Sequence, residues 1–307
     1  MIKWFSMVLK AVIPNLRAEV EQTAPSVARP LLKLHRLIYL CGPDKRLHPC
    51  ATGLLFGAGA LRFLITAAHV LDENFFRSET DFCDLVTYGQ GQPVILKGES
   101  FRTIIPNGRT REDDPLDVGF IRLDAEMVAQ IGEDRFLSPA NVDLKDNGEF
   151  PALYGALGYP ACQNQTIEPD DESQIKPFAF SYTAQLRSAQ EHEALGISTA
   201  SHLLLAASNN KSRRSGGFKA KIPDLHGMSG GGLWRYTEYG QAPNTRTPCL
   251  LGVLIERRRK TGNILAARMG LVFEGLRRAY PELNEVLPRT GLADITVQIV
   301  TRPAAHP

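Results

Sequence analysis

The chain has 307 residues, of which 43% are hydrophobic and 22% charged, a composition typical of a globular protein long enough to bury a large core. Its formal net charge of +2 shows no bias toward polyanions, so no nucleic-acid partner is expected. The five cysteines are odd in number and lack the close pairing of zinc ligands. We therefore expect reduced thiols, a cytoplasmic location, no metal and no cofactor.

The N-terminal stretch MIKWFSMVLKAVIPN is apolar but interrupted by Lys10. It is too short to span a bilayer, and no clear signal-peptide cleavage site follows it. We expect residues 1–34 to form a helical segment packed on the protein body, with contact at a membrane surface as the alternative. No stable membrane span is expected.

Short apolar runs separated by Gly, Pro, Asn and Asp occupy most of the chain and predict β-strands. In FAFSYTAQL (178–186) apolar side chains alternate with small or polar ones, which is typical of a half-buried strand. Only residues 270–287 have helical spacing, and Pro281 is expected to interrupt that helix. The remaining predicted strands cover 35–41, 50–57, 61–67, 83–88, 116–123, 152–159, 202–207, 249–256 and 263–269.

Two polar stretches are predicted to be loops. Residues 163–177 are acidic, and residues 208–221 are basic and rich in Gly and Ser. The basic stretch lies just before a serine and glycine cluster. We expect it to be a solvated connection, with a substrate-steering patch as the alternative.

That cluster reads DLHGMSGGGLW (224–234), in which Ser229 has Gly227, Gly230 and Gly231 as neighbours. Glycine costs about 0.5–1 kcal/mol relative to alanine inside regular structure, so the cluster indicates a backbone that bends sharply or lies close to something. Two interpretations are open: a surface turn, or a nucleophilic serine beside exposed backbone N–H groups.

A serine nucleophile needs a base, and the base needs an orienting acid. His69 lies in LITAAHVLD, where an apolar strand ends and a helical turn is expected to begin. Asp117 lies in PLDVGFIRL, at the start of another apolar strand. Taken singly, each residue also suits a structural role. Asp113 and Asp114, close to Asp117, are interpreted as solvated loop charges.

TAAHV around His69, LDVGFIRL from Asp117 and GMSGG around Ser229 together resemble the trypsin/chymotrypsin-like serine peptidases of the bacterial type. The order His, Asp, Ser and the gaps of 48 and 112 residues fit that family, over roughly residues 35–287. The G-x-S-x-G pattern also occurs in α/β-hydrolases, where a helix follows the serine and the histidine comes later. Here GGGLW follows, and the only later histidine is His306.

The resemblance implies a serine endopeptidase that hydrolyses peptide bonds through an acyl-enzyme intermediate. His69, Asp117 and Ser229 would form the catalytic triad, and the N–H groups of Gly227 and Ser229 the oxyanion hole. The implied partners are a protein or peptide substrate, with a dedicated protein target or a regulatory protein partner as an option.

The implied fold is all-β, with two six-stranded antiparallel β-barrels. Its expected parts are an N-terminal segment (1–34), a first barrel with the histidine and aspartate (35–150), a second barrel with the serine (151–270) and a C-terminal helix and tail (271–307).

The chain departs from the family pattern at several positions. Val70 follows the histidine, where secreted members often carry a disulfide-bonded cysteine. Met228 stands where many members carry an aspartate that pairs with a newly formed N-terminus, so such activation is not expected. The alternative function is a catalytically silent, protein-binding member of the family, which the complete triad argues against. The expected substrate-pocket residues are Pro223, Asp224, His226, Glu256 and Arg257.

Overall fold

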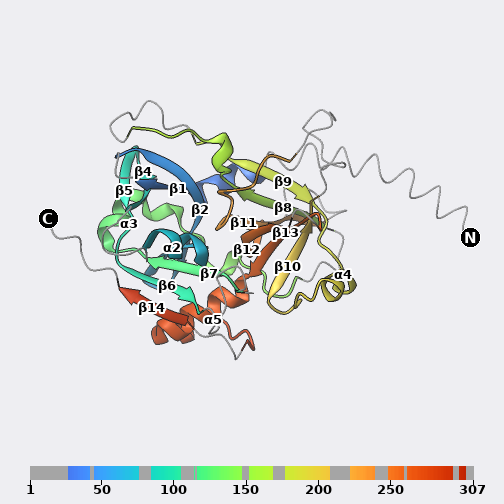
Figure 1. Ribbon diagram of the computed structural model, residues 1–307. Coiled ribbons are helices and arrows are strands. Elements are labelled where there is room, and N and C mark those ends of the chain that lie inside the picture. The colour runs from blue at the N-terminus through green and yellow to red at the C-terminus, as the bar shows by residue number, and fades with distance from the viewer. Residues whose placement is uncertain are drawn as a thin grey trace, which may run out of the picture.

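Strands dominate the computed structural model (Figure 1). The end of the N-terminal segment is helical over residues 27–31 and continues into a 3-10 helix, Leu32–Leu34, whereas the apolar stretch before it lies outside the described residues. Within the described ranges, no helix is long and apolar enough to cross a membrane. The structure describes residues 27–41, 45–75, 84–104, 114, 116–146, 152–168, 177–207, 222–238, 248–258, 261–292 and 297–301.

The first antiparallel sheet contains the strands that flank the expected histidine and aspartate. Helix α2 (Ala68–Phe75) follows its third strand, and helix α3 (Ala125–Ile131) follows its seventh. Its strands are β1 (His35–Cys41), β2 (Leu47–Ala58), β3 (Leu61–Ala67), β4 (Asp84–Gly89), β5 (Gln92–Ile95), β6 (Glu99–Thr103), β7 (Val118–Arg122) and β14 (Val297–Thr301). They lie side by side in the order β14-β6-β7-β3-β2-β1-β4-β5.

The second antiparallel sheet has six strands, as expected for a barrel. Its outer strands are joined by the pairing of Leu186 with Leu205 and by the bond from Arg187 N–H to the carbonyl of Leu204 (2.8 Å), so the sheet closes on itself. Helix α4 (Ala189–Ala194) lies between these strands in the chain. The strands, in sheet order, are β10 (His202–Ala206), β13 (Asn263–Arg268), β12 (Cys249–Arg258), β11 (Gly232–Glu238), β8 (Ala152–Gly158) and β9 (Phe180–Ala184).

The two-sheet, all-β architecture is thus confirmed, but the first sheet has eight strands rather than six. The C-terminal tail accounts for part of the difference, because β14 pairs with β6 from Val297 opposite Thr103 to Thr301 opposite Glu99. Figure 1 shows β14 beside β6, next to the last helix. The four-residue strand β5 forms the other edge of this sheet.

Helix α5 (Met269–Ala279) is the expected C-terminal helix. It ends at Ala279, and Tyr280 is extended, because the ring of Pro281 disfavours the helical conformation of the preceding residue. A 3-10 helix, Pro281–Glu285, follows, which confirms the predicted interruption. The other short 3-10 helices are Glu133–Arg135, Pro139–Asn141 and Ala161–Gln163.

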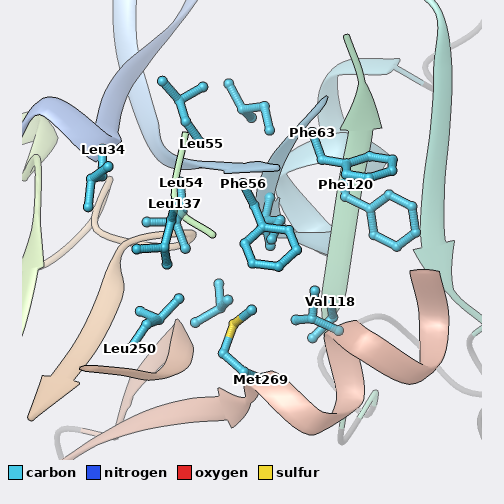
Figure 2. Packing of buried hydrophobic residues seen from close by; sticks show 14 of the residues in the cluster. Leu34, Leu54, Leu55, Phe56, Phe63, Val118, Phe120, Leu137, Leu250 and Met269 are labelled. Atoms are coloured by element: carbon cyan, nitrogen blue, oxygen red, sulfur yellow. The ribbon is translucent and has the colours of Figure 1, made fainter. Parts of the chain in front are cut away.

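The main hydrophobic core lies between the two sheets and α5. The rings of Phe56 on β2 and Phe273 on α5 lie 5.6 Å apart between centroids. Figure 2 shows Leu250 of β12 and Met269 of α5 on the other side of this core from the aromatic pair Phe63 and Phe120. Full burial of one such side chain contributes about 1.5–3 kcal/mol, so this core holds the two sheets together.

Four cysteines lie in the described part of the chain, and they form no disulfide with one another. They are Cys41, Cys50, Cys162 and Cys249, whereas Cys83 lies outside the described residues. Apolar packing therefore joins the two sheets without a cross-link among these four residues. The expectation that the thiols are reduced in the cell stays a prediction.

His35, the first residue of β1, is a buried histidine whose titration links stability to pH. Its Nδ1–H donates to the carbonyl of Leu31 (2.9 Å), and its ring lies 5.8 Å from that of Trp234. Desolvation by burial lowers the pKa of His35 to about 4. An unfolded histidine has a pKa of about 6.5. At pH values between about 4 and 6.5, His35 is therefore protonated in the unfolded chain but neutral in the folded one. The stability contribution is complete above about pH 6.5 and is lost as the pH falls toward 4.

We therefore expect the protonation of His35 in the unfolded chain to reduce the free energy of unfolding by roughly 2 kcal/mol when the pH is lowered from 7.5 to 5. Urea titrations of wild type and His35→Gln at both pH values measure this contribution, and the variant should show a smaller loss. His48→Gln, which changes an exposed histidine, is the matched control and should behave as wild type. Equal pH dependence in wild type and His35→Gln would contradict the prediction.

Candidate active site

The pairing of β3 with β7 brings His69 and Asp117 together. Ala67, at the end of β3, lies opposite Val118, at the start of β7. Because the strands are antiparallel, the residues that follow Ala67 meet those that precede Val118. The N–H of Ala68 donates to the carbonyl of Asp117 (3.0 Å) and extends the ladder by one bond. The chain then enters α2, as expected, and His69 lies beside the aspartate.

Two hydrogen bonds connect Asp117 to His69. Carboxylate Oδ1 accepts the backbone N–H of His69 (2.9 Å), and Oδ2 lies 2.7 Å from its Nδ1. The imidazole is 30% exposed and the carboxylate 12%. Burial raises the pKa of Asp117, and the hydrogen bonds from His69 oppose that shift. A proton on Nδ1, donated to the carboxylate, leaves Nε2 of the neutral imidazole as a proton acceptor.

Ser229 lies in a tight turn that packs against β2 and β3. Its carbonyl accepts the N–H of Thr52 (2.9 Å), and the N–H of Gly230 donates to the carbonyl of Leu254 (2.7 Å). Gly230 has a φ of +88°, and a Cβ there would lie 1.9 Å from the carbonyl oxygen of Thr52. It would also lie 2.9 Å from Cα of Thr66 on β3. Glycine is therefore required for the serine turn to approach the strand that leads into α2.

The hydroxyl of Ser229 donates to the carbonyl oxygen of Ile255 on β12 (3.2 Å). A hydroxyl has one hydrogen, so the structure does not place Ser229 in a donated hydrogen bond to His69. Catalytic hydrogen bonds are often absent or poorly aligned before substrate binds. To reach another acceptor, the hydroxyl has to leave Ile255 by rotation about the Cα–Cβ bond.

The residues just before Ser229 form a tight turn around Gly227. The N–H of Met228 donates to the carbonyl of Leu225 (2.9 Å), and Gly227 has a φ of +90°. This hydrogen bond and a positive φ at the third residue are typical of a type II turn, which favours glycine there. The hydroxyl of Thr52 donates to the carbonyl of Gly227 (2.8 Å) and holds the turn against β2.

A further bond sets the direction of the Gly227 N–H group. The carbonyl of His226 accepts the N–H of Ala161 (2.7 Å). In a trans peptide the C=O and N–H point in opposite directions, so the N–H of Gly227 points away from Ala161. In the described part of the chain, the N–H groups of Gly227 and Ser229 have no acceptor. Both donors are therefore available to an acceptor outside the described contacts.

Met228 leads to a prediction about activation. It is buried, 3% exposed, in the apolar cluster of the second sheet. A thioether carries no charge, and burying an unpaired ammonium beside it would be costly. The turn is already held by hydrogen bonds from Ala161 and Thr52. We therefore expect the turn to be formed in the full-length chain, without insertion of a new N-terminus.

The test compares the intact chain with versions that begin at successive positions between Ala18 and Leu34. A fluorophosphonate, which reacts with activated serines, should label Ser229 in none of them faster than in the intact chain. Chemically acetylated versions serve as controls, because acetylation removes the terminal charge. A large rise in labelling that depends on one new N-terminus and disappears on its acetylation would overturn the prediction.

The five expected pocket residues lie on two segments next to the serine. Pro223 is half-buried, and Asp224 and His226 are exposed just before the turn. Glu256 is exposed on β12, directly after the residue that accepts the serine hydroxyl. Arg257 belongs to β12, but its side chain lies outside the described residues. Their role in substrate selection stays a prediction.

Sequence reasoning missed two polar residues that hold the site. The sequence around Thr52 gives no indication of this role, because the residue it contacts, Gly227, lies 175 positions away. Asp114 is not the solvated loop charge that its sequence context suggests, because it is 7% exposed and accepts the N–H of Asp117 (3.0 Å). Its position three residues before Asp117 was the available signal. No group of three or more metal-ligating side chains occurs among the described residues.

No protein-family model and no curated protein sequence matches the chain. Among solved structures, it is similar to the thermostable serine protease AL20 from an extremophilic microorganism (12% identity, TM-score 0.45, covering 82% of this chain and 97% of that one). It is also similar to a Glu endopeptidase (12% identity, TM-score 0.44, 80% and 90%) and to HBP (14% identity, TM-score 0.44, 85% and 95%). Sequence identities of 12–14% do not establish an activity for this chain.

Proposed function

We propose that this chain is a serine endopeptidase with His69, Asp117 and Ser229 as its catalytic triad. The observation that carries the proposal is the pair of hydrogen bonds from His69 to Asp117, at 2.7 and 2.9 Å. A second support is the turn at Ser229, whose N–H group and that of Gly227 have no acceptor among the described residues. These are the parts that acyl transfer requires: a base, its orienting acid, a hydroxyl and an oxyanion site.

In the proposed reaction, Oγ of Ser229 attacks the carbonyl carbon of a peptide bond, and Nε2 of His69 takes the hydroxyl proton. The carbonyl oxygen becomes an oxyanion that accepts hydrogen bonds from the N–H groups of Gly227 and Ser229. The imidazolium, held by Asp117, then gives its proton to the leaving amine as the C–N bond breaks. Water, activated by His69, attacks the acyl-enzyme and releases the second product.

A catalytically silent, protein-binding module is the second candidate. One observation favours it: the Ser229 hydroxyl donates to the carbonyl of Ile255 rather than to His69. The deciding experiment is to treat purified protein with a fluorophosphonate, map the labelled peptide, and profile cleavage sites in a whole-proteome digest. We expect labelling at Ser229 and cleavage of protein substrates. Folded protein that neither labels nor cleaves would support the binding module.

A further inference from the structure

We propose that Asp114 and Thr103 are positioning residues that act through Asp117, setting the geometry of the His69–Asp117 pair. The inference rests on the proposed function of that pair. Neither residue touches His69 in the contacts described above, so neither is a catalytic residue. Their side chains instead bind the backbone on both sides of Asp117.

The carboxylate of Asp114 and the hydroxyl of Thr103 together accept three successive backbone N–H groups. Oδ1 of Asp114 accepts from Leu116 (2.9 Å), and Oδ2 accepts from Asp117 (3.0 Å). The hydroxyl of Thr103 accepts from Val118 (3.2 Å) and donates to Oδ2 of Asp114 (2.7 Å). Both side chains are buried, at 7% and 4% exposure. The backbone around Asp117 is therefore held by a single small polar network.

This network holds Asp117 in a conformation that residues with a side chain rarely adopt. Its φ is +42°, in the left-handed region. Such conformations persist where the surrounding contacts over-determine them, and they occur at functional sites. From this backbone position the carboxylate reaches both N–H groups of His69, and the carbonyl of Asp117 accepts the N–H of Ala68. The unusual φ thus serves the contacts that orient the imidazole.

Strand β6 extends the same support to the histidine. Arg102, next to Thr103 on this strand, forms an ion pair with Asp72, one turn after His69 on α2. The strand is itself paired with β7 on one side and with β14 on the other. Neighbouring residues of β6 therefore brace the helix that carries His69 and the backbone that carries Asp117.

The test compares Thr103→Val, which removes the hydroxyl at nearly constant volume, with Thr103→Ser, which restores it. Asp114→Ala removes the three acceptor contacts described above for that carboxylate. Thr87→Val is the matched control, since Thr87 is fully buried in the same sheet and its hydroxyl bonds only the carbonyl of Leu37 (2.9 Å) among the contacts described. Each variant is assayed for the rate of fluorophosphonate labelling at Ser229. The Nδ1–H proton resonance of His69, which a short bond to a carboxylate shifts far downfield, is recorded by NMR.

We expect Thr103→Val and Asp114→Ala to slow labelling by about 10²-fold, the scale of a small misplacement of catalytic groups. They should also lose the downfield resonance, whereas Thr103→Ser and Thr87→Val keep both. Retention of the resonance in folded Thr103→Val would overturn the proposal, as would an equal loss in Thr87→Val. If Asp114→Ala does not fold, the proposal is decided by comparing Thr103→Val with Thr103→Ser and with Thr87→Val. The resonance reports geometry even in a protein that does not label, so failure of the proposed enzyme function is distinguishable from failure of this inference.

Discussion

Replacing Ser229 with alanine is expected to lower the turnover of a cleaved substrate by roughly 10⁶-fold, the scale seen when a triad nucleophile is removed. The change deletes the only atom proposed to attack the peptide bond. The structure should tolerate it, because among the described contacts the hydroxyl makes one long hydrogen bond, to the carbonyl of Ile255 (3.2 Å). His69→Ala should be about as damaging. The double variant should be little worse, since the two residues act as one unit.

The measurement is kcat/KM on a substrate taken from the cleavage profile, together with fluorophosphonate labelling and thermal unfolding. Ser181→Ala is the matched control, because it removes a serine hydroxyl from β9 that contacts only Tyr236 (3.0 Å) among the described side chains. It should retain activity. A folded Ser229→Ala protein that cleaves at the wild-type rate would show that another residue is the nucleophile.

Replacing Asp117 with asparagine is expected to lower turnover by about 10⁴-fold, the scale of the corresponding change in a serine protease triad. Both carboxylate oxygens accept N–H groups of His69, one from the backbone and one from the ring. Asparagine has one oxygen and one NH₂ group, so one of these donors would face another donor. If the ring avoids the conflict by moving its proton to Nε2, that nitrogen no longer takes the serine proton.

This prediction is checked by the pH dependence of kcat/KM and by the Nδ1–H resonance of His69, which should disappear. Asp146→Asn is the matched control, since Asp146 is a buried carboxylate in an ion pair with Arg235 (2.8 Å), remote from His69 in the chain. The control separates the loss of a buried charge from the loss of the correct tautomer. Comparable activity losses in both variants would count against a specific role for Asp117.

The sequence by itself determined the fold class and the local setting of each candidate residue. Apolar runs broken by turn residues predicted the strands, because alternation and strand length are local properties. The sequence around His69 correctly indicated that a strand ends and a helix begins there. Pro281 correctly predicted where the last helix stops. The glycines around Ser229 likewise indicated a bend, since the backbone preference of glycine is local too.

Only the tertiary structure decided how these pieces meet. The contact of Thr52 with Gly227 spans 175 residues, and that of Tyr280 with Glu99 spans 181. Pairing of the C-terminal tail with β6 was equally unforeseen, although it changes the strand count of the first sheet. The same holds for Asp114, whose carboxylate accepts the hydroxyl of Thr103 from strand β6. Such contacts carry no periodic signal along the chain, because register, sheet closure and the burial of a polar group are set by packing between segments distant in sequence.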